Sequence, residues 1–529
     1  MSLYLGFDSS TQGLTAIVLE VEGDRTHIVF ESTLKFDDAF PQYGTVHGVL
    51  PRTDPTTAVS SPPMWADAID AMMARVAASG LDVSRLDAIA GSAQQHGSVY
   101  LTGDATETFA RFDARSAPGE QVARCLSRPV APIWMDASTT RECEEIASAV
   151  GGAGALAART GSRAFERFTG PQIRKFFRQD PAAYAGTERI HLVSSFLASL
   201  LAGGDAPIDP GDGSGMNLMD LATAAWWPAA LDATAPDLGP KLPRIAPSWA
   251  VAGRLSPYWR ARHGFPAARV VVWSGDNPCS LVGTGLVREG RVAISLGTSD
   301  VIFGLMNEPR VDATGTGHVF GSPTGTFMGL TVFANGSLAR ERVRDMFGLT
   351  WPRFSDLLAT TPAGNHGRIF LPWFDPEITP PVLVPGVRRF GLSPDDAAGH
   401  VRGVVEAQMA ALALHSRWMG VAIDRIHATG GASANRAILQ VMADVFGADV
   451  YQFEMGNSAC LGAALRARHA HAMAEGLRLS WDDIVRGVAE PLAASRLQPD
   501  SARHAIYQDF KRVYAAREAE ALASSGEPS

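Results

Sequence analysis

The feature that most limits the fold of this chain is a strand–turn–strand unit that occurs twice. The first copy joins two apolar runs, 3–7 and 14–19, through a polar turn at 8–13. The second copy joins 293–296 and 301–305 through a turn that again combines Gly, Thr, Ser and Asp. Apolar runs rich in β-formers around a short polar turn are typical of β-hairpins. Two copies about half a chain apart predict a duplicated domain.

Each half continues in the same order after its hairpin. A further apolar strand is expected at 27–30 in the first half and at 327–333 in the second. Each half then supplies a helix and another strand, at 86–91 and at 425–429, that ends in polar or glycine-rich residues. The sequence therefore predicts an α/β fold made of two duplicated mixed domains with a cleft between them.

Chain length supports two domains, since 529 residues exceed the size at which a single core keeps growing. We expect a first domain at 1–268 and a second at 269–529, which would open with a buried strand at 269–273. The segment 248–266 is the expected hinge, and 132–135 a short strand of the first domain.

Composition excludes several classes of partner. The net charge is −9, and the sequence contains no block of Lys or Arg, so nucleic acid and anionic membranes are not expected partners. No apolar run approaches the roughly 20 residues of a membrane span, and no signal peptide is expected. The four cysteines lack CxxC spacing, which argues against a zinc site or disulfides. We expect a cytoplasmic protein, as a monomer or homodimer.

The first turn carries a carboxylate, Asp8, together with the hydroxyls of Ser10 and Thr11. A carboxylate can hold Mg²⁺ or its waters, and hydroxyls with backbone N–H groups can bind phosphate oxygens. One such turn alone is more often an ordinary surface turn, but its recurrence around Thr298 favours a shared role in binding nucleotide.

A second candidate is Asp276, followed at once by Asn277, at the point where a strand gives way to a helix. A carboxylate there can accept a hydroxyl proton, and the amide can bind a neighbouring hydroxyl. Transfer of a phosphoryl group to an alcohol needs such a base. The alternative is a helix cap, a common role of Asp.

Glycines follow the second-half strand at Gly430 and Gly431, and Asn435 lies where a helix begins. Glycines let a ligand approach the backbone, and a helix N-terminus favours anions; a plain strand-to-helix turn is the alternative. The sequence has no GxGxxG fingerprint, no GxxxxGK[ST] loop and no protein-kinase signature.

Polar side chains of the first half suit a ligand with several hydroxyls. They include His96 in an amide-rich turn, Trp134 at the end of the strand expected there, and Arg167, whose fork suits a sugar hydroxyl or carbonyl. A structural histidine and a solvated helix face are the alternatives.

Taken together, these segments resemble the FGGY carbohydrate kinases of the actin-like (ribonuclease H-like) ATPase superfamily, most of all the branch of D-xylulose kinases. The resemblance covers nearly the whole chain. It rests on GFDSSTQG (6–13), QQHGS (94–98), WMD (134–136), ERFTG (166–170), DGSGMNLMD (212–220), SGDNP (274–278), SLGTSD (295–300), NGSLARE (335–341) and TGGASAN (429–435).

The resemblance implies an ATP-dependent kinase that phosphorylates the terminal hydroxyl of D-xylulose. It assigns the general base to Asp276 and sugar binding to His96, Arg167, Asp276 and Asn277. It places Mg²⁺ at Asp8. ATP would be bound by Asp8, Ser10, Thr11 and Thr298 at its phosphates, and by Trp351, Gly430, Gly431 and Asn435 at its nucleoside.

Two departures from the family pattern leave the sugar open. Where many family members have Pro-Lys-aliphatic ending in Trp, this chain has PQIRKF at 171–176, and Ala-Ser rather than Arg follows the WMD triplet. D-ribulose or another ketose or polyol is the alternative substrate. Two hypotheses of a different class are a nucleotide-gated sugar-binding protein without kinase activity, which would not need Asp276 as a base, and an inactive sensor.

Overall fold

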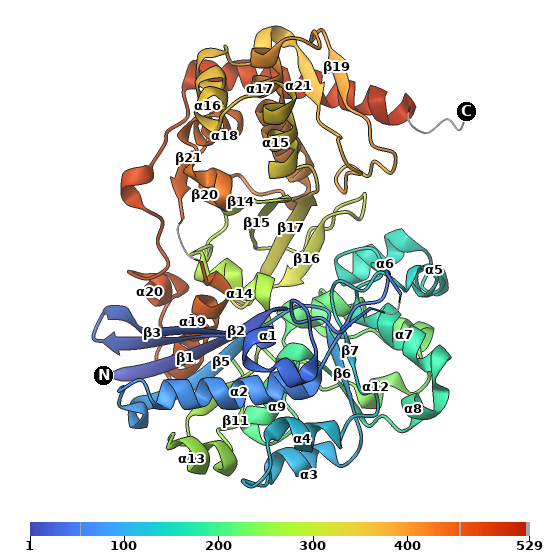
Figure 1. Cartoon of the computed structure of the whole chain (residues 1–529), viewed down its shortest axis with the longest axis vertical. Coiled ribbons are helices and arrows are strands. Elements are labelled where there is room, and N and C mark those ends of the chain that lie inside the picture. The colour runs from blue at the N-terminus through green and yellow to red at the C-terminus, as the bar shows by residue number, and fades with distance from the viewer. Residues whose placement is uncertain (53, 454–455, 525–529) are drawn as a thin grey trace. The chain divides into compact units, whose positions relative to one another are not determined.

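The computed structural model describes residues 1–52, 54–453 and 456–524. The chain divides into two compact units (Figure 1). Unit 1 comprises Met1–Val287, Val319–Met328 and Gly456–Glu490, and unit 2 comprises Arg288–His318, Gly329–Met455 and Pro491–Ser529.

The central sheet of unit 1 has the strand order β11-β12-β5-β1-β2-β3, with β13 beside β5. Strands β1, β2 and β3 form an antiparallel meander, β5 is parallel to β1, and β12 and β13 are parallel to β5. The bounds are β1 (Ser2–Ser9), β2 (Gly13–Glu22), β3 (Arg25–Lys35), β5 (Leu86–Ala93), β11 (Val251–Arg254), β12 (Arg269–Val271) and β13 (Ser274–Gly275).

This sheet explains where the sequence analysis differs from the structure. The expected boundary between 268 and 269 falls inside unit 1, because β12 and β13 extend the first sheet rather than open a second one. The segment expected as a hinge, 248–266, also lies within unit 1, where it forms β11 and helix α13 (Pro257–His263). The expected strand at 132–135 is also shorter, as β7 (Ala131–Pro132) ends before Trp134.

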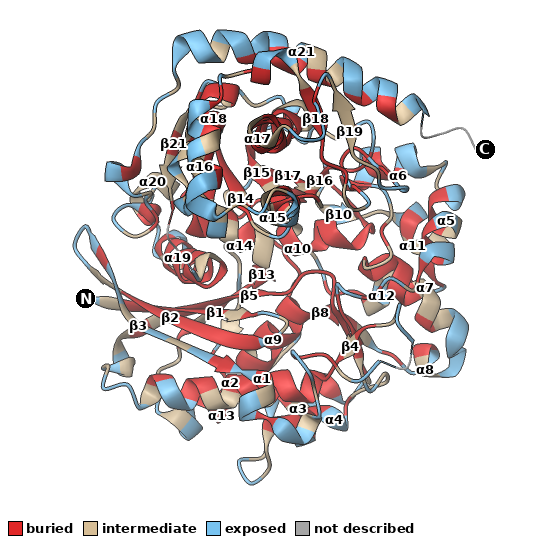
Figure 2. Cartoon of the chain, turned by 45° about the horizontal axis from the view of Figure 1, so that its top comes forward, coloured by how far each residue is buried: buried red, intermediate tan, exposed pale blue. Residues whose placement is uncertain are grey.

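Helices cover both faces of the unit 1 sheet. Helices α14 (Asp276–Gly283) and α19 (Ser458–Ala474) pack on one face, and α2 (Pro62–Ala77) and α9 (Val193–Ala202) on the other (Figure 1). Most of α9 and α19 is buried (Figure 2), so both are core helices. Helix α9 is largely apolar, whereas α19 also buries the side chains of Arg466, Arg468 and His469.

Smaller elements of unit 1 surround this core. They are α1 (Phe36–Ala39), β4 (Val59–Ser60), β6 (Ser98–Leu101), α3 (Ala105–Ala110), α4 (Pro118–Ala123), α5 (Thr140–Ala149), α6 (Ala153–Thr160), α7 (Thr169–Gln179), α8 (Pro181–Ala185), β8 (Arg189–Leu192), α10 (Pro210–Gly213), β9 (Met219–Asp220), β10 (Ala225–Trp226), α11 (Pro228–Thr234), α12 (Leu238–Lys241) and α20 (Trp481–Val485).

The sheet of unit 2 repeats the topology of the first. Its order is β16-β17-β15-β14-β20-β21, with β14 antiparallel to β15 and parallel to β20, and β21 parallel to β20. The strands are β14 (Arg291–Leu296), β15 (Asp300–Met306), β16 (His318–Gly321), β17 (Phe327–Phe333), β20 (Arg425–Thr429) and β21 (Asp449–Gln452). Because β14, β15, β17, β20 and β21 take the places of β1, β2, β3, β5 and β12, the predicted duplication is confirmed.

Helix α17 is the central buried helix of unit 2 (Figure 2), and α21 lies largely exposed. The bounds are α15 (Ser337–Met346), α16 (Trp351–Thr360), α17 (Ala397–His415), α18 (Arg436–Phe446) and α21 (Ser501–Ser524), with a small ladder of β18 (Ile369–Leu371) and β19 (Arg388–Phe390).

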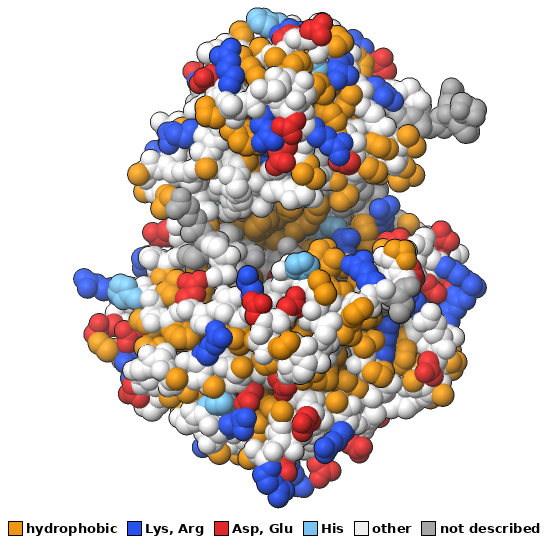
Figure 3. All heavy atoms as spheres, viewed as in Figure 1, with side chains coloured by type: hydrophobic (Ala, Val, Ile, Leu, Met, Phe, Trp, Pro, Cys, Tyr) orange, Lys and Arg blue, Asp and Glu red, His pale blue; other side chains and the backbone are white. Residues whose placement is uncertain are grey.

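The surface of the chain carries charges of both signs. Acidic and basic side chains are interspersed on the face shown in Figure 3 rather than gathered by sign. Within the described residues, no helix has both the length and the apolar character needed to cross a membrane.

Candidate active site

Parallel strands bring the candidate residues of unit 1 to one edge of its sheet. Asp8 in β1 lies opposite Ser92 in β5, and Ser92 lies opposite Ser274 in β13. The chain then continues from β5 into the turn that holds His96, and from β13 directly into Asp276. The carboxyl ends of parallel strands are where α/β folds bind ligands.

Asp276 is the first residue of α14, and Gly275 is the N-cap. Its carboxylate accepts hydrogen bonds from the backbone N–H of Asn277 at 2.8 Å and from Asn277 Nδ2 at 3.1 Å. Burial, and then the negative charge of Asp8, raise the pKa of Asp276 to about 7. A carboxylate with a pKa near neutrality is suited to accept a proton at physiological pH.

Asp8 is the second carboxylate at this edge, and burial raises its pKa as well. Within the described residues, its Oδ1 is buried and accepts no hydrogen bond. An unpartnered carboxylate oxygen fits a hard cation such as Mg²⁺. The described residues contain no group of three or more His, Cys, Asp or Glu that could hold a metal ion, so the other ligands would be waters and phosphate oxygens, as is common for Mg²⁺.

His96 has a left-handed backbone conformation, with φ of +69°. Its Nδ1 lies 2.8 Å from the carbonyl oxygen of Gly215, and its ring stacks on Phe168 with centroids 4.3 Å apart. Burial, and then the charge of Arg167, lower the pKa of His96 to about 3. The ring is therefore neutral, and Nδ1 carries the proton because a carbonyl only accepts; Nε2 is left as an acceptor.

The other predicted sugar residues lie around the same turn. Asn277 donates from Nδ2 to Gln95 Oε1 at 2.7 Å. The guanidinium of Arg167 lies over the ring of Phe165, 4.8 Å from its centroid, and burial lowers its pKa. Unit 1 thus brings His96, Arg167, Asp276 and Asn277 together.

Sequence reasoning missed Asp212, a buried carboxyl that interacts electrostatically with Asp276. This side chain is 1% exposed and accepts a hydrogen bond from Ser194 Oγ at 2.5 Å. Burial, and then the charges of Asp209 and Asp276, raise its pKa. The segment around it looks like a Gly-rich loop in the sequence, whereas the structure forms α10 there; the DGSG run was its only signal.

The hydroxyls of the first turn are engaged within the protein. Ser10 donates to the carbonyl of Gly13 at 3.1 Å. Thr11 accepts from Trp134 Nε1 at 2.8 Å and donates to Gln94 Oε1 at 3.4 Å. Thr11 therefore links the turn to the polar residues that follow β5.

Unit 2 gathers its own candidates at the equivalent edge. Thr298 is exposed in the turn after β14, and Gly430 follows β20, the parallel neighbour of β14. Gly430 has φ of +83°, and a Cβ there would lie 2.7 Å from the carbonyl oxygen of Leu296. A Cβ on Gly431 would meet no described atom within 4 Å, so its backbone is open to a ligand.

Asn435 and Trp351 lie on neighbouring helices. The Asn435 side chain caps α18 by accepting from the N–H groups of Ala437 and Ile438, and donates to Ser355 of α16 at 2.8 Å. Trp351 begins α16 and is 41% exposed. The guanidinium of Arg344 lies over the Trp351 ring, 4.7 Å from its centroid. The exposed part of the ring suits the stacking of an adenine base.

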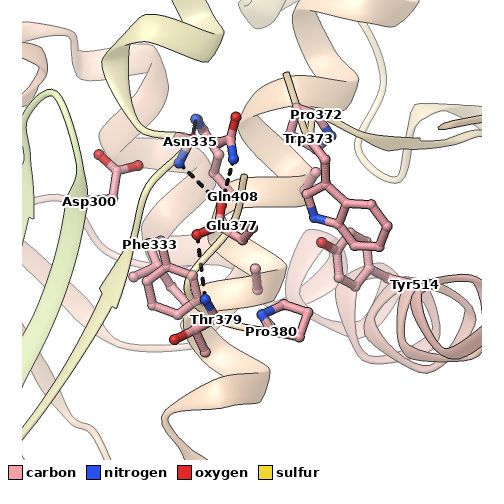
Figure 4. Close-up of a pocket in the computed structure, with 13 residues that line it drawn as sticks. Asp300, Phe333, Asn335, Pro372, Trp373, Glu377, Thr379, Pro380, Gln408 and Tyr514 are labelled. Carbon is pink, nitrogen blue, oxygen red and sulfur yellow. Dashed lines mark hydrogen bonds between the residues drawn. The ribbon is translucent and has the colours of Figure 1, made fainter. Parts of the chain in front are cut away.

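A buried polar cluster begins at Asp300, the residue that follows the second turn, and Figure 4 shows its members Asp300, Asn335 and Glu377. Asp300 pairs with Arg340 at 2.9 Å. The Glu377 carboxylate accepts from the backbone N–H of Ala334 at 2.6 Å and from Asn335 Nδ2 at 2.9 Å. These carboxylates are satisfied within the protein, and the cavity of about 20 Å³ beside them has room for about one water.

Comparison with known proteins agrees with this geometry. The N-terminal domain of the FGGY family of carbohydrate kinases matches residues 124–283, and the C-terminal domain of that family matches residues 292–471. The chain is also 40% identical to a xylulose kinase of Mus musculus over 536 residues, covering 99% of this chain and 95% of that protein. The chain belongs to the FGGY family of carbohydrate kinases. It is therefore a sugar kinase, and family membership implies the use of ATP.

Other members show how far the likeness extends. The chain is 42% identical to xylulose kinase 2 of Arabidopsis thaliana, covering 88% of this chain and 87% of that one. The crystal structure of xylulose kinase from Rhodospirillum rubrum has a TM-score of 0.82 at 21% identity, with 99% and 100% of the two chains covered. Glycerol kinase from Plasmodium falciparum, solved with ADP, has a TM-score of 0.76 at 15% identity, with 100% and 99% covered. These two structures share the fold of this FGGY kinase.

Proposed function

We propose that this FGGY kinase transfers the γ-phosphate of ATP to the terminal hydroxyl of D-xylulose, giving D-xylulose 5-phosphate and ADP. The observation that carries the proposal is Asp276, a carboxylate with a pKa of about 7, beside Asn277 and close to the charge of Asp8. The relatives named xylulose kinase, 40% and 42% identical over most of the chain, support the choice of sugar.

The groups around Asp276 match a small neutral sugar. Nε2 of His96 accepts a hydrogen bond from a sugar hydroxyl, and the side-chain amide of Asn277 binds a further hydroxyl. The Arg167 guanidinium donates a hydrogen bond to a hydroxyl or to the ketose carbonyl. Because His96 is neutral, its contribution does not depend on charge. Another ketose or a polyol with similarly spaced hydroxyls would make some of these hydrogen bonds. D-ribulose and related sugars therefore remain the alternative substrates.

The chemistry assigned to Asp276 is general-base catalysis. As the terminal hydroxyl oxygen forms its bond to the γ-phosphorus, the hydroxyl proton passes to the Asp276 carboxylate, and the bond from the γ-phosphorus to the departing ADP oxygen breaks. Asn277 holds the ionised carboxylate in place through its N–H. Asp8 would hold Mg²⁺, which neutralises phosphate charge when bound.

Nucleotide binding is assigned to both turns and to unit 2. Ser10, Thr11 and Thr298 would bind phosphate oxygens. The nucleoside would lie against Gly430 and Gly431, with Asn435 and Trp351 on the adjacent helices α18 and α16. The open backbone at Gly431 and the exposed Trp351 ring support this assignment.

A coupled assay of ADP release tests the proposal. D-xylulose, D-ribulose, other ketoses and polyols would be offered at equal concentration with Mg²⁺ and ATP. We expect the highest kcat/KM for D-xylulose, with the phosphorylated product identified by mass. ADP release that no sugar stimulates would contradict the kinase function and favour a nucleotide-gated binding protein. A higher kcat/KM for another sugar would show that this sugar, rather than D-xylulose, is the preferred substrate.

A further inference from the structure

We propose that Gly215 is a positioning residue that fixes His96 in the orientation in which its Nε2 meets the sugar. This inference rests on the proposed function, because it concerns the same sugar site. The residue lies in a short helical turn, 214–216, that follows α10.

The backbone of His96 needs external support. A φ of +69° is uncommon for a residue with a side chain and strains the backbone. Thr169 donates from its hydroxyl to the His96 carbonyl at 3.1 Å, and the Phe168 ring stacks on the imidazole. The carbonyl of Gly215 fixes the remaining freedom, the rotation of the ring, by accepting from Nδ1.

Only a glycine lets that carbonyl approach the ring. A Cβ at residue 215 would lie 2.8 Å from both Cε1 and Nδ1 of His96. Because this is closer than carbon atoms tolerate, a side chain would push the ring away and lengthen the bond to the carbonyl. A Cβ on Gly213, two residues earlier, would lie 3.3 Å from Ile208 Cγ2 and 3.4 Å from Met219 Sδ, contacts that a shift of a few tenths of an ångström relieves.

The turn that holds Gly215 is itself anchored. Ser214 is 1% exposed; its hydroxyl donates to the carbonyl of Pro210 and accepts from the backbone N–H of Gly321 at 3.0 Å. Gly321 ends β16, a strand that pairs in the second sheet although its segment Val319–Met328 is grouped with unit 1. In that segment, the backbone N–H of Val319 donates to the carbonyl of Gly161 at 3.0 Å. A segment remote in sequence thus fixes the turn that orients His96.

Orientation of Nε2 sets the affinity for the sugar rather than the chemical step. His96 lies apart from the proton transfer assigned to Asp276, so a tilted ring loses one hydrogen bond to the sugar. A net hydrogen bond contributes about 0.5–1.5 kcal/mol, which is a factor of about two to twelve in affinity. Gly215 influences sugar affinity only by orienting the His96 ring. A substitution of Gly215 should therefore change sugar affinity only when His96 is present.

A double-mutant cycle tests this dependence. Gly215→Ala, His96→Ala and the double variant would be compared with the wild type, with Gly213→Ala as the matched control. We expect Gly215→Ala to raise the KM for D-xylulose about two- to twelvefold, with kcat and the KM for ATP changed less than twofold. The rise should vanish in the His96→Ala background, and Gly213→Ala should behave as the wild type.

An equal rise in KM with and without His96, or no rise at all, would overturn the positioning role. If Gly215→Ala does not fold, nitrogen NMR of the wild type shows which ring nitrogen of His96 carries the proton. A proton on Nδ1 is expected from the bond to the Gly215 carbonyl, and a proton on Nε2 would overturn the positioning role. A wild type that phosphorylates no sugar would contradict the proposed function. Normal wild-type turnover, with Gly215→Ala matching Gly213→Ala, would contradict only the positioning role.

Discussion

The substitution Asp276→Asn is expected to stabilise the fold increasingly as the pH rises. Burial and the charge of Asp8 raise the pKa of this carboxyl from 3.8 to about 7. A raised acid pKa means that the folded chain holds the proton more tightly than the unfolded chain does. Asparagine has nearly the shape of the neutral acid and never ionises. The variant therefore avoids the free-energy cost of a buried negative charge beside Asp8.

The size of the effect follows from proton linkage. Below about pH 4 the carboxyl is neutral in both states and the pH dependence vanishes. Between about pH 4 and 7 it ionises mainly in the unfolded chain, so the free energy of unfolding falls by up to about 1.4 kcal/mol per pH unit; above pH 7 the fall levels off. Residual exposure of the side chain reduces this, and we expect a loss of about 1–3 kcal/mol between pH 5 and 8.

Urea denaturation of wild type and variant at several pH values measures the difference. The advantage of Asp276→Asn should be greater at pH 8 than at pH 5 by about 1–3 kcal/mol. Asp24→Asn, which removes a carboxylate at an exposed turn, serves as the control and should show no such growth. A variant whose stability relative to wild type is the same at pH 5 and 8 would refute the raised pKa.

Three further outcomes are expected. Asp8→Asn should lower kcat on the order of 10²–10³, with sugar affinity by calorimetry nearly unchanged; near-native kcat at ordinary Mg²⁺ would contradict the metal assignment. Gly430→Ala should destabilise the chain by about 1–3 kcal/mol or more, because φ is +83° and Leu296 blocks a side chain, while Gly431→Ala should denature at the wild-type urea concentration; equal effects would contradict this packing. Because the pKa of His96 is about 3, its ring should stay neutral and should cause no change in the KM for the sugar from pH 5.5 to 8. A rise in this KM at low pH that disappears in His96→Gln would contradict a neutral ring.

Much of the fold could be predicted because it depends on local patterns. The strands around the turn at 8–13 and its second copy carry continuous apolar runs, and β17 and β20 have the expected bounds. The repeat made the duplicated topology predictable as well. Strand order at the end of unit 1 was not predictable, since whether β12 joins the first or the second sheet depends on contacts with β5, remote in sequence.

The candidate site could likewise be predicted only in part. Asp8 could be found because it lies at the carboxyl end of an apolar strand, and Asp276 because it begins a helix after a strand; the parallel pairing of β1 and β13 with β5 then brings them to one edge of the sheet. Asp212 and Gly215 could not be found, because their segment contains only Gly, Ser and Asp and its short helical turns depend on Ser194 and on the Val319–Met328 segment. The coupling of Thr11 to Trp134 likewise joins segments that no local pattern relates.

The central claim is that Asp276 is the general base for phosphoryl transfer to the sugar. The most direct test measures kcat and the calorimetric affinity for D-xylulose together in Asp276→Asn. General-base assistance contributes about 10²–10⁴-fold, so kcat should fall by at least a hundredfold. The dissociation constant for the sugar should change only a few-fold, because His96, Arg167 and Asn277 remain. A folded variant that keeps more than a tenth of the wild-type kcat would contradict the account.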